Sequence, residues 1–322
     1  MITVLETLEK IGIVPVIKID DAEKAVPLAK ALAAGGIPCA EITFRTAQGE
    51  EAVRRIAKEA PDVLLGAGTV LTTEQVDCAI GAGAQFIVSP GFNPRVVEYC
   101  IQKGIPIIPG CANPSDVERA LEFGLEVVKF FPAEQAGGLK YIKAISAPYA
   151  NLKFIPTGGI NAGNVAKYIA FEKILACGGS WMADSDLINA GEFEKIAALS
   201  REAMLTMLGF TVMYVGTNAK GDEAAIKAAQ LLSSLFGFVS MNGTNSIFTG
   251  DSTEALKASA PGAHLHIAVG TNSIARAVAW LERNGIEIDH AGAKKDAKGG
   301  MIAVCLKETI LGFAVHLHQI KK

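Results

Sequence analysis

Residues 63–91 read VLLGAGTVLTTEQVDCAIGAGAQFIVSPG, and this stretch decides the fold class. A short apolar run ends in glycines, an amphipathic segment ending at Gly83 follows, and a second apolar run ends at Ser89 and Pro90. Glycine is common just after a helix, and short apolar runs between turn residues indicate buried strands. The stretch therefore predicts strand, helix and strand, which is the repeating unit of a parallel sheet.

The same alternation continues on both sides of this stretch, through residues 1–205. The expected strands are Ile13–Ile19, Cys39–Phe44, Val63–Gly66, Gln85–Val88, Ile105–Ile108, Val127–Phe130, Lys153–Ile155 and Ile174–Cys177. Most of them are too apolar for a sheet with one face in water. Eight strand–helix units in about 200 residues predict an α/β fold of the (β/α)8 TIM-barrel type, and a doubly wound open sheet is the alternative.

Residues 208–322 predict a second, smaller α+β domain. Its expected elements are a strand (Phe210–Val215), a helix (Asp222–Phe236), strands within Phe238–Thr249, a strand (His264–Val269), a helix (Ser273–Asn284) and strands Glu287–His290, Met301–Leu306 and Phe313–Gln319. The same order of elements occurs twice, which indicates an internal repeat of βαβββ-type modules.

Composition narrows the classes of function. The net charge of −3 gives no general attraction to nucleic acid, and the sequence has neither a basic, apolar leader nor a membrane-length apolar run. We therefore expect a cytoplasmic protein without nucleic-acid or membrane partners. The six cysteines are scattered without a CxxC pair, which favours reduced thiols. All five histidines lie beyond residue 263, so chemistry in the first domain proceeds without histidine.

Functional side chains of a (β/α)8 barrel gather where its strands end. The candidates at these ends are Glu41, Arg45, Thr69, Pro90, Lys129, Thr157, Gly158, Gly159, Gly178, Gly179 and Ser180. The TGGI and GGSW segments can present backbone N–H groups, and Ser180 a hydroxyl, to a phosphate. Glycines after strands also make ordinary turns.

Lys129 is the strongest single candidate. It lies within VVKFFPAE, and strand alternation points it into the barrel. An unpaired buried ammonium is costly, which favours the neutral amine that attacks a ketone. The alternative is a structural lysine paired with a core carboxylate.

Glu41 is the candidate proton carrier, directly or through water, or an ion-pair partner of Arg45 or Lys129. Arg45 offers a planar fork for a carboxylate or phosphate.

These motifs resemble the bacterial aldolases for 2-keto-3-deoxy-6-phosphogluconate and 4-hydroxy-2-oxoglutarate over about residues 1–205. The resemblance includes AVPLAKALAAGGI, EITFRT, VLLGAGTVL, AQFIVSPG, IPIIPGCA, VVKFFPAE, FIPTGGI and GGSW, in the family's order and spacing. The sequence departs from many members at Asn113 and at Lys18, which could shift substrate preference.

The resemblance implies a class I aldolase that needs no metal and is typically a homotrimer. It implies that Lys129 forms the Schiff base and that Glu41 is the acid/base. Arg45 and Thr69 would hold the pyruvate carboxylate, and Pro90 and Phe131 would shape the pocket. The distal phosphate or carboxylate would be held by Thr157, Gly158, Gly159, Gly179 and Ser180.

Residues 208–322 resemble, more weakly, the vicinal oxygen chelate fold of glyoxalase-like proteins. His264, His266, His316 and His318 are the candidate ligands of a divalent metal, since each pair is spaced i, i+2 and shares one face of its strand. A metal-free folding or assembly module is the alternative.

The predicted reaction is the cleavage of 2-keto-3-deoxy-6-phosphogluconate to pyruvate and glyceraldehyde 3-phosphate, the cleavage of 4-hydroxy-2-oxoglutarate to pyruvate and glyoxylate, or both. The alternative is a phosphosugar isomerase or epimerase on the same barrel with a structural lysine. In that case the second domain would be a ligand- or metal-sensing module.

Overall fold

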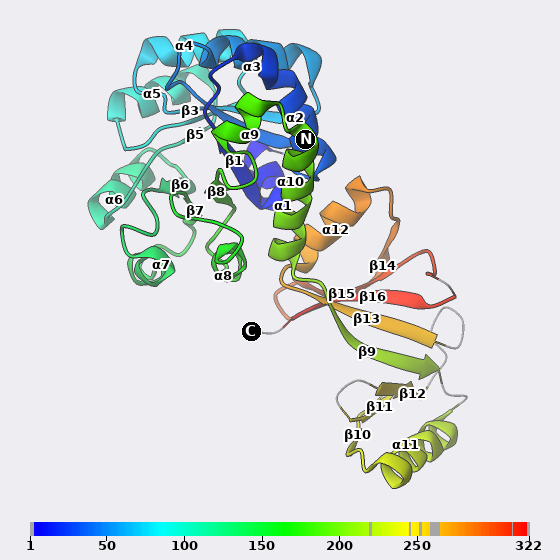
Figure 1. The fold of residues 1–322 in the computed structure, drawn as a ribbon. Coiled ribbons are helices and arrows are strands. Elements are labelled where there is room, and N and C mark those ends of the chain that lie inside the picture. Colours follow the sequence, from blue (N-terminus) through cyan, green and yellow to red (C-terminus); the bar gives the residue numbers. More distant parts are fainter. Residues whose placement is uncertain are drawn as a thin grey trace. The chain divides into compact units, whose positions relative to one another are not determined.

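The protein divides into two compact units, Met1–Met207 and Leu208–Lys322 (Figure 1). The computed structural model describes residues 3–218, 221–244, 246–250, 253–257, 265–310 and 312–320. The first unit is an α/β structure and the second is mostly sheet. None of the described helices is both long and apolar enough to cross a membrane.

The first unit alternates strands with helices along its whole length. Its strands are β1 (Ile13–Ile17), β2 (Cys39–Thr43), β3 (Leu64–Gly68), β4 (Phe86–Val88), β5 (Ile107–Ile108), β6 (Val127–Phe130), β7 (Lys153–Pro156) and β8 (Cys177–Gly179). Its helices are α1 (Val4–Ile11), α2 (Ala25–Ala34), α3 (Gly49–Glu59), α4 (Thr73–Ala82), α5 (Pro94–Lys103), α6 (Pro114–Glu122), α7 (Gly138–Ser146), α8 (Val165–Ile169), α9 (Ser185–Ala190) and α10 (Phe193–Leu208), with the 3-10 helix η1 (Ala22–Lys24).

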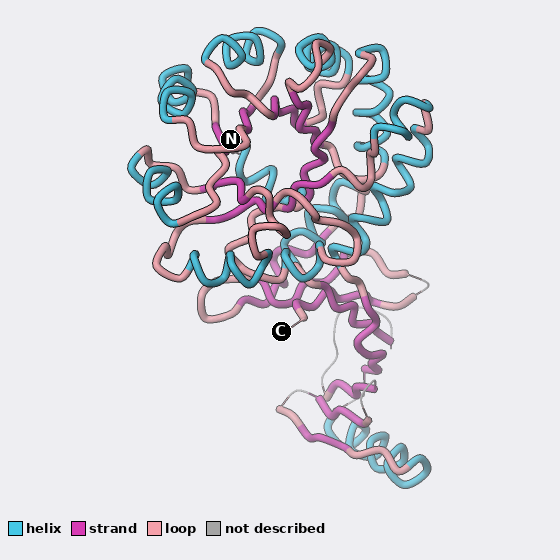
Figure 2. Tube along the Cα trace, turned by 60° about the vertical axis from the view of Figure 1, so that its left-hand side comes forward, coloured by secondary structure: helices cyan, strands magenta, loops and turns pink. Residues whose placement is uncertain are grey.

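Local sequence explains where these elements begin and what they bury. Thr72, Asn93 and Asn113 cap α4, α5 and α6 by accepting hydrogen bonds from backbone N–H groups in the first turn, as short polar residues at this position do. Every residue of β2 and β3 is buried, since these strands have helices on one side and packed side chains on the other. Figure 2 shows the strands of this unit at its centre, with the helices outside them.

All strand pairs of the first unit are parallel. Six strands form one sheet in the order β5-β4-β3-β2-β1-β8, and β6 pairs with β7. Two isolated parallel bridges join these groups, Gly110 with Lys129 and Thr157 with Gly178. Parallel pairing brings the carboxyl ends of the strands, where the candidate residues lie, to the same side of the unit.

The second unit is built on an eight-stranded sheet in the order β10-β11-β12-β9-β13-β16-β15-β14. Its elements are β9 (Thr211–Asn218), α11 (Asp222–Phe236), β10 (Ser240–Asn242), β11 (Ser246–Thr249), β12 (Thr253–Leu256), β13 (Leu265–Thr271), α12 (Ile274–Arg283), β14 (Ile288–Lys295), β15 (Met301–Leu306) and β16 (Ala314–Gln319). Each half is one strand, one helix and three strands, and the last strand of each half pairs in parallel with its first.

Several elements differ in their bounds from the sequence prediction, and β14, for example, continues to Lys295 rather than ending at His290. The eighth strand begins at Cys177 rather than at Ile174, because the pairing of β8 with β1 starts at Cys177 and Ile13. Ile174 lies outside β8, in an isolated bridge with Phe154. The strand β12 was not predicted, because its sequence TEAL has little intrinsic preference for a strand. Pairing with β9 and β11 on its two sides holds it extended.

Candidate active site

Lys129 on β6 and Glu41 on β2 form a buried ion pair. The Lys129 Nζ donates a hydrogen bond to Glu41 Oε1 at 3.2 Å, and the two residues are only 6% and 3% exposed. A buried charge without a partner is costly, and here each charged group has the other within hydrogen-bond distance. An amine and a carboxylate in contact can exchange a proton directly, which is what acid–base chemistry on a lysine adduct requires.

Gly68, at the end of β3, makes room for the Glu41 side chain. Glu41 pairs with Gly66 on the neighbouring strand, and Gly68 follows on the same face of that strand. A Cβ atom added at Gly68 would lie 2.4 Å from Glu41 Oε1 and 2.7 Å from its Cγ, which is too close for any real contact. The carboxylate keeps its position beside Lys129 because residue 68 has no side chain.

Substituting Gly68 with alanine is therefore expected to displace Glu41 and to lower by about 10²-fold the kcat of the reaction that this pair carries out, the usual effect of an ångström-scale misplacement. The matched control is Gly81→Ala in α4, where an added Cβ meets nothing within 4 Å. Steady-state kinetics and thermal unfolding of both variants provide the measurement. An unchanged kcat in Gly68→Ala would show that the position of Glu41 is not critical.

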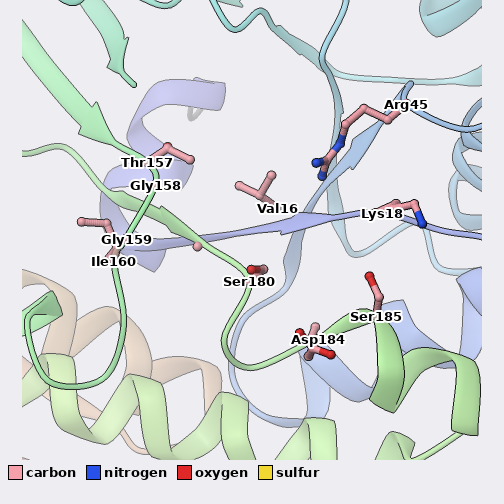
Figure 3. Close-up of a pocket in the computed structure, with 12 residues that line it drawn as sticks. Val16, Lys18, Arg45, Thr157, Gly158, Gly159, Ile160, Ser180, Asp184 and Ser185 are labelled. Carbon is pink, nitrogen blue, oxygen red and sulfur yellow. The ribbon is translucent and has the colours of Figure 1, made fainter. Parts of the chain in front are cut away.

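A cavity of about 320 Å³ opens where strands β1, β7 and β8 end (Figure 3). It is lined by Val16, Lys18, Arg45, Thr157, Gly158, Gly159, Ile160, Gly179, Ser180, Ala183, Asp184 and Ser185. Six of the candidates from the sequence therefore share one cavity: Arg45, Thr157, Gly158, Gly159, Gly179 and Ser180. A cationic side chain, hydroxyl groups and glycine backbone together suit an anionic ligand.

Arg45 is anchored although it is exposed. Its Nε donates to Thr43 Oγ1 at 3.2 Å, and the Thr43 hydroxyl donates in turn to the Ile17 carbonyl on β1 at 2.8 Å. These bonds fix the base of the guanidinium group and leave its two terminal nitrogens directed at the cavity (Figure 3). A planar fork held in this way can bind a carboxylate or phosphate with two parallel hydrogen bonds.

Thr157 connects the ion pair to this cavity. It lines the 320 Å³ cavity and also a small internal space of about 10 Å³ that Glu41 and Lys129 line as well. Its Oγ1 is buried and has no hydrogen-bond partner among the described residues. A hydroxyl in this position is free to bond a ligand that reaches from the cavity to the amine.

Three further candidates, Phe131, Thr69 and Pro90, line neither of these cavities. The Lys129 Nζ lies 5.5 Å from the centre of the Phe131 ring, which is 38% exposed. Thr69 follows β3 with φ of 58°, a left-handed conformation that is uncommon for a threonine. The Pro90 carbonyl packs tightly against Gly110, where an added Cβ would lie 2.0 Å from the oxygen.

Six cavity residues were not proposed as site residues from the sequence, and they are Val16, Lys18, Ile160, Ala183, Asp184 and Ser185. Val16 and Lys18 follow the rule that strand ends carry function, so the end of β1 could have indicated them. The Lys18 ammonium lies 2.8 Å from Asp20, which tethers it at the rim. Asp184 and Ser185 begin α9, and only a helix-cap pattern distinguishes them in the sequence.

The second unit holds a cluster of imidazoles on one face of its sheet. His266 Nε2 lies 3.0 Å from Glu254 Oε2, and the His266 and His316 ring centres are 4.9 Å apart. The His318 ring lies 6.0 Å from that of His316. His266 Nδ1, His316 Nε2 and His318 Nε2 are buried without hydrogen-bond partners among the described residues.

The metal site expected in this domain is not formed by the described side chains. Within the described ranges, no group of three or more His, Cys, Asp or Glu side chains could hold a metal ion. His266 is bonded to Glu254, and His316 Nδ1 faces Cys305 Sγ at 3.7 Å, so their nitrogens do not converge on one point. His264, the remaining candidate, lies outside the described residues.

The histidine cluster is expected to make the second unit sensitive to acid. Burial, together with the nearby His266 and His318, lowers the pKa of His316 from 6.5 to about 4. As the pH falls, His316 therefore takes up a proton at a higher pH in the unfolded chain than in the folded one. Its contribution to the stability of the second unit is complete above about pH 6.5 and is lost as the pH falls toward 4. Hydrogen exchange of β13 and β16 peptides, corrected for the intrinsic rate, measures this loss. An equally steep loss in His316→Gln would contradict the assignment.

Comparison with known proteins gives a consistent result for the first unit. A family model described as KDPG and KHG aldolase matches residues 4–199. The chain is 54% identical over 204 residues to the 2-dehydro-3-deoxy-phosphogluconate aldolase of Treponema pallidum, a match that covers 63% of this chain and 97% of that relative. It is 43% identical over 192 residues to the KHG/KDPG aldolase of Escherichia coli K12, with 60% and 90% covered.

A solved structure shows the same similarity. The KDPG aldolase of Legionella pneumophila, with pyruvate captured as a covalent carbinolamine intermediate, superposes with a TM-score of 0.61 at 37% identity. The superposition covers 62% of this chain and 98% of that one. The family model alone spans more than half of the 322 residues. The chain therefore belongs to the KDPG and KHG aldolase family.

Proposed function

We propose that the protein is a class I aldolase that cleaves 2-keto-3-deoxy-6-phosphogluconate to pyruvate and glyceraldehyde 3-phosphate, 4-hydroxy-2-oxoglutarate to pyruvate and glyoxylate, or both. The observation that carries the proposal is the buried contact between Lys129 Nζ and Glu41 Oε1, 3.2 Å long. In a chain of this family, a carboxylate on β2 in contact with an amine on β6 inside the first unit provides the two groups that the reaction needs.

The proposed reaction begins at Lys129. Its neutral amine attacks the C2 carbonyl of the keto acid, and loss of water leaves an iminium ion. The Glu41 carboxylate takes the proton of the C4 hydroxyl, the C3–C4 bond breaks, and the bond's electrons move to the iminium nitrogen. The aldehyde leaves, Glu41 returns the proton to C3, and water hydrolyses the imine to release pyruvate. No metal or redox partner is required, because the iminium ion accepts the electrons.

The remaining candidates divide into two binding subsites in this proposal. Arg45 and Thr69 hold the pyruvate carboxylate, with Pro90 and Phe131 shaping the pocket around Lys129. The distal phosphate or carboxylate is held by Thr157, Gly158, Gly159, Gly179 and Ser180. The common cavity supports the distal group and Arg45, and the Phe131 ring 5.5 Å from Lys129 Nζ supports the proximal group.

The eight strands of the first unit are proposed to close into a (β/α)8 barrel. The six-stranded sheet ends at β5 and β8, and the isolated bridges of Gly110 with Lys129 and of Thr157 with Gly178 lie at the two junctions with the β6–β7 pair. Closure would bring Glu41 and Lys129 into one interior, which their contact supports. Residues 1–205 are then the aldolase domain.

Residues 208–322 are proposed to form a domain of the vicinal oxygen chelate type. Two successive βαβββ modules in one sheet support this assignment.

We also propose a homotrimer in the cytoplasm. Apolar side chains exposed on and beside α4, α5 and α6 support self-association, and they are Leu71, Ile80, Ile101 and Leu121. Light scattering coupled to size-exclusion chromatography would measure the mass of the assembly.

Borohydride reduction in the presence of pyruvate tests the proposed function. Reduction of an imine adds a stable pyruvyl group, which peptide mass mapping would find on Lys129. If folded protein gave no adduct on this residue, Lys129 would be structural and an isomerase or epimerase on the same scaffold would become the better explanation. If the adduct forms on Lys129, cleavage rates with each of the two keto acids would show which aldehyde the enzyme prefers.

A further inference from the structure

The distal cavity depends on a loop whose peptide planes are held from outside. The loop is Thr157–Ile160, and Gly158 and Gly159 have φ of 99° and 80°, a conformation that favours glycine. The Thr157 carbonyl accepts from Ala133 N at 2.8 Å and the Gly158 carbonyl from Glu134 N at 3.1 Å. The side-chain amides of Asn161 and Asn164 donate to the Gly159 carbonyl at 3.2 and 3.0 Å.

These contacts turn the loop's N–H groups toward the cavity. In a trans peptide the N–H points opposite to the C=O of the same unit. Three consecutive carbonyls are bound by residues that do not line the cavity, so the N–H groups of Gly158, Gly159 and Ile160 face the other way, and these three residues do line it. Consecutive N–H groups of this kind form a concave site for an anion.

Glu134, between β6 and α7, is the residue that ties this loop to its surroundings. Its side chain packs flat on Gly159, where an added Cβ would lie 2.6 Å from Glu134 Cγ. The hydroxyl of Tyr168, a buried residue of α8, donates a hydrogen bond to Glu134 Oε1. Burial and the nearby carboxylate raise the pKa of Tyr168, which keeps this donor protonated. Neither residue lines the cavity.

We infer that Glu134 and Tyr168 are positioning residues for the distal anion, setting affinity for the phosphorylated end of the substrate without taking part in imine chemistry. This inference rests on the proposed aldolase function. The Glu134 backbone N–H holds one carbonyl of the loop, its side chain covers Gly159, and the Tyr168 hydroxyl fixes that side chain. Lys129 and Glu41 have their own hydrogen bond and do not depend on this contact.

Tyr168→Phe tests the inference, because it removes only the hydroxyl. We expect the KM for the phosphorylated keto acid and the dissociation constant of inorganic phosphate to rise about tenfold, as for loss of one charge-assisted hydrogen bond. The rate of borohydride trapping with pyruvate alone should stay at the wild-type value. Glu134→Ala should reproduce this pattern, whereas Glu134→Gln, which keeps an acceptor oxygen, should be close to wild type.

Tyr99→Phe is the matched control, because the Tyr99 hydroxyl donates to Asp77 at 2.7 Å on the outer helices α5 and α4. It should change neither KM nor trapping. An unchanged phosphate affinity in Tyr168→Phe would overturn the inference, and so would a parallel fall in pyruvate trapping, which would indicate a general structural role. Calorimetric binding of phosphate does not require turnover. A wild-type protein that binds phosphate but traps no pyruvate would therefore refute the aldolase function separately.

Discussion

Replacing Lys129 with methionine is expected to abolish aldol cleavage, with kcat lower by about 10⁴-fold or more, as for the loss of a covalent nucleophile. Methionine has nearly the length of lysine but no amine, so no imine can form. Borohydride should then leave no pyruvyl adduct on the protein. Kinetics with the phosphorylated keto acid and mass mapping of the reduced protein measure both effects.

Controls separate the chemistry of Lys129 from its part in stability. Removing the cation leaves the Glu41 carboxylate buried without its partner, which costs about 3–5 kcal/mol in comparable pairs. Lys129→Arg retains the positive charge but not the nucleophile and should be equally inactive. Lys153→Met provides the matched control, because Lys153 pairs with Glu9 at 2.6 Å and both are more than one-third exposed. Residual cleavage in folded Lys129→Arg would exclude the imine mechanism.

Glu41→Gln is expected to lower kcat by about 10²–10⁴-fold, the usual contribution of a positioned proton carrier. Glutamine keeps the volume and an acceptor oxygen for Lys129 Nζ, but it cannot accept the C4 hydroxyl proton or deliver a proton to C3. We expect a pyruvyl adduct on Lys129 to remain detectable, while exchange of pyruvate methyl protons with deuterated water becomes slow. Nuclear magnetic resonance follows this exchange without any aldehyde.

Glu9→Gln is the corresponding control, since Glu9 also pairs with a lysine but in an exposed position. It should exchange methyl protons at the wild-type rate. Rapid exchange in Glu41→Gln would assign the proton transfer to another group. Loss of both the adduct and the exchange would mean that Glu41 is needed earlier, when the imine forms.

Much of the first unit could be predicted from its sequence because its signals are local. Apolar runs between turn residues marked β1 to β7 to within two residues at each end, and Lys129 stood out as a charge within one of them. Its buried contact with Glu41 was one of the alternatives, and the structure shows this contact. The start of β8 was wrong because CGG has weak strand preference, and only pairing with β1 fixes its register.

Features that depend on distant pairing could not be predicted. The strand β12 exists because β9 and β11 flank it. The histidines of β13 and β16 do lie together, but which nitrogen bonds to Glu254 or faces Cys305 depends on packing across five strands, from β12 to β15. For the same reason, Asp184 and Ser185 reach the cavity only through the turn that follows β8.

The separation of Glu41 and Lys129 by 88 residues has a consequence for synthesis of the chain. A nascent polypeptide that has emerged as far as β5 contains Glu41 but not yet Lys129. After β6 has emerged with Lys129, β7 must still follow and pair with β6. Reactivity toward pyruvate should therefore arise late, when β6 and β7 have joined the earlier strands. Borohydride with labelled pyruvate would then count correctly assembled molecules among misfolded ones, as a covalent marker for folding of the first unit in cell extracts.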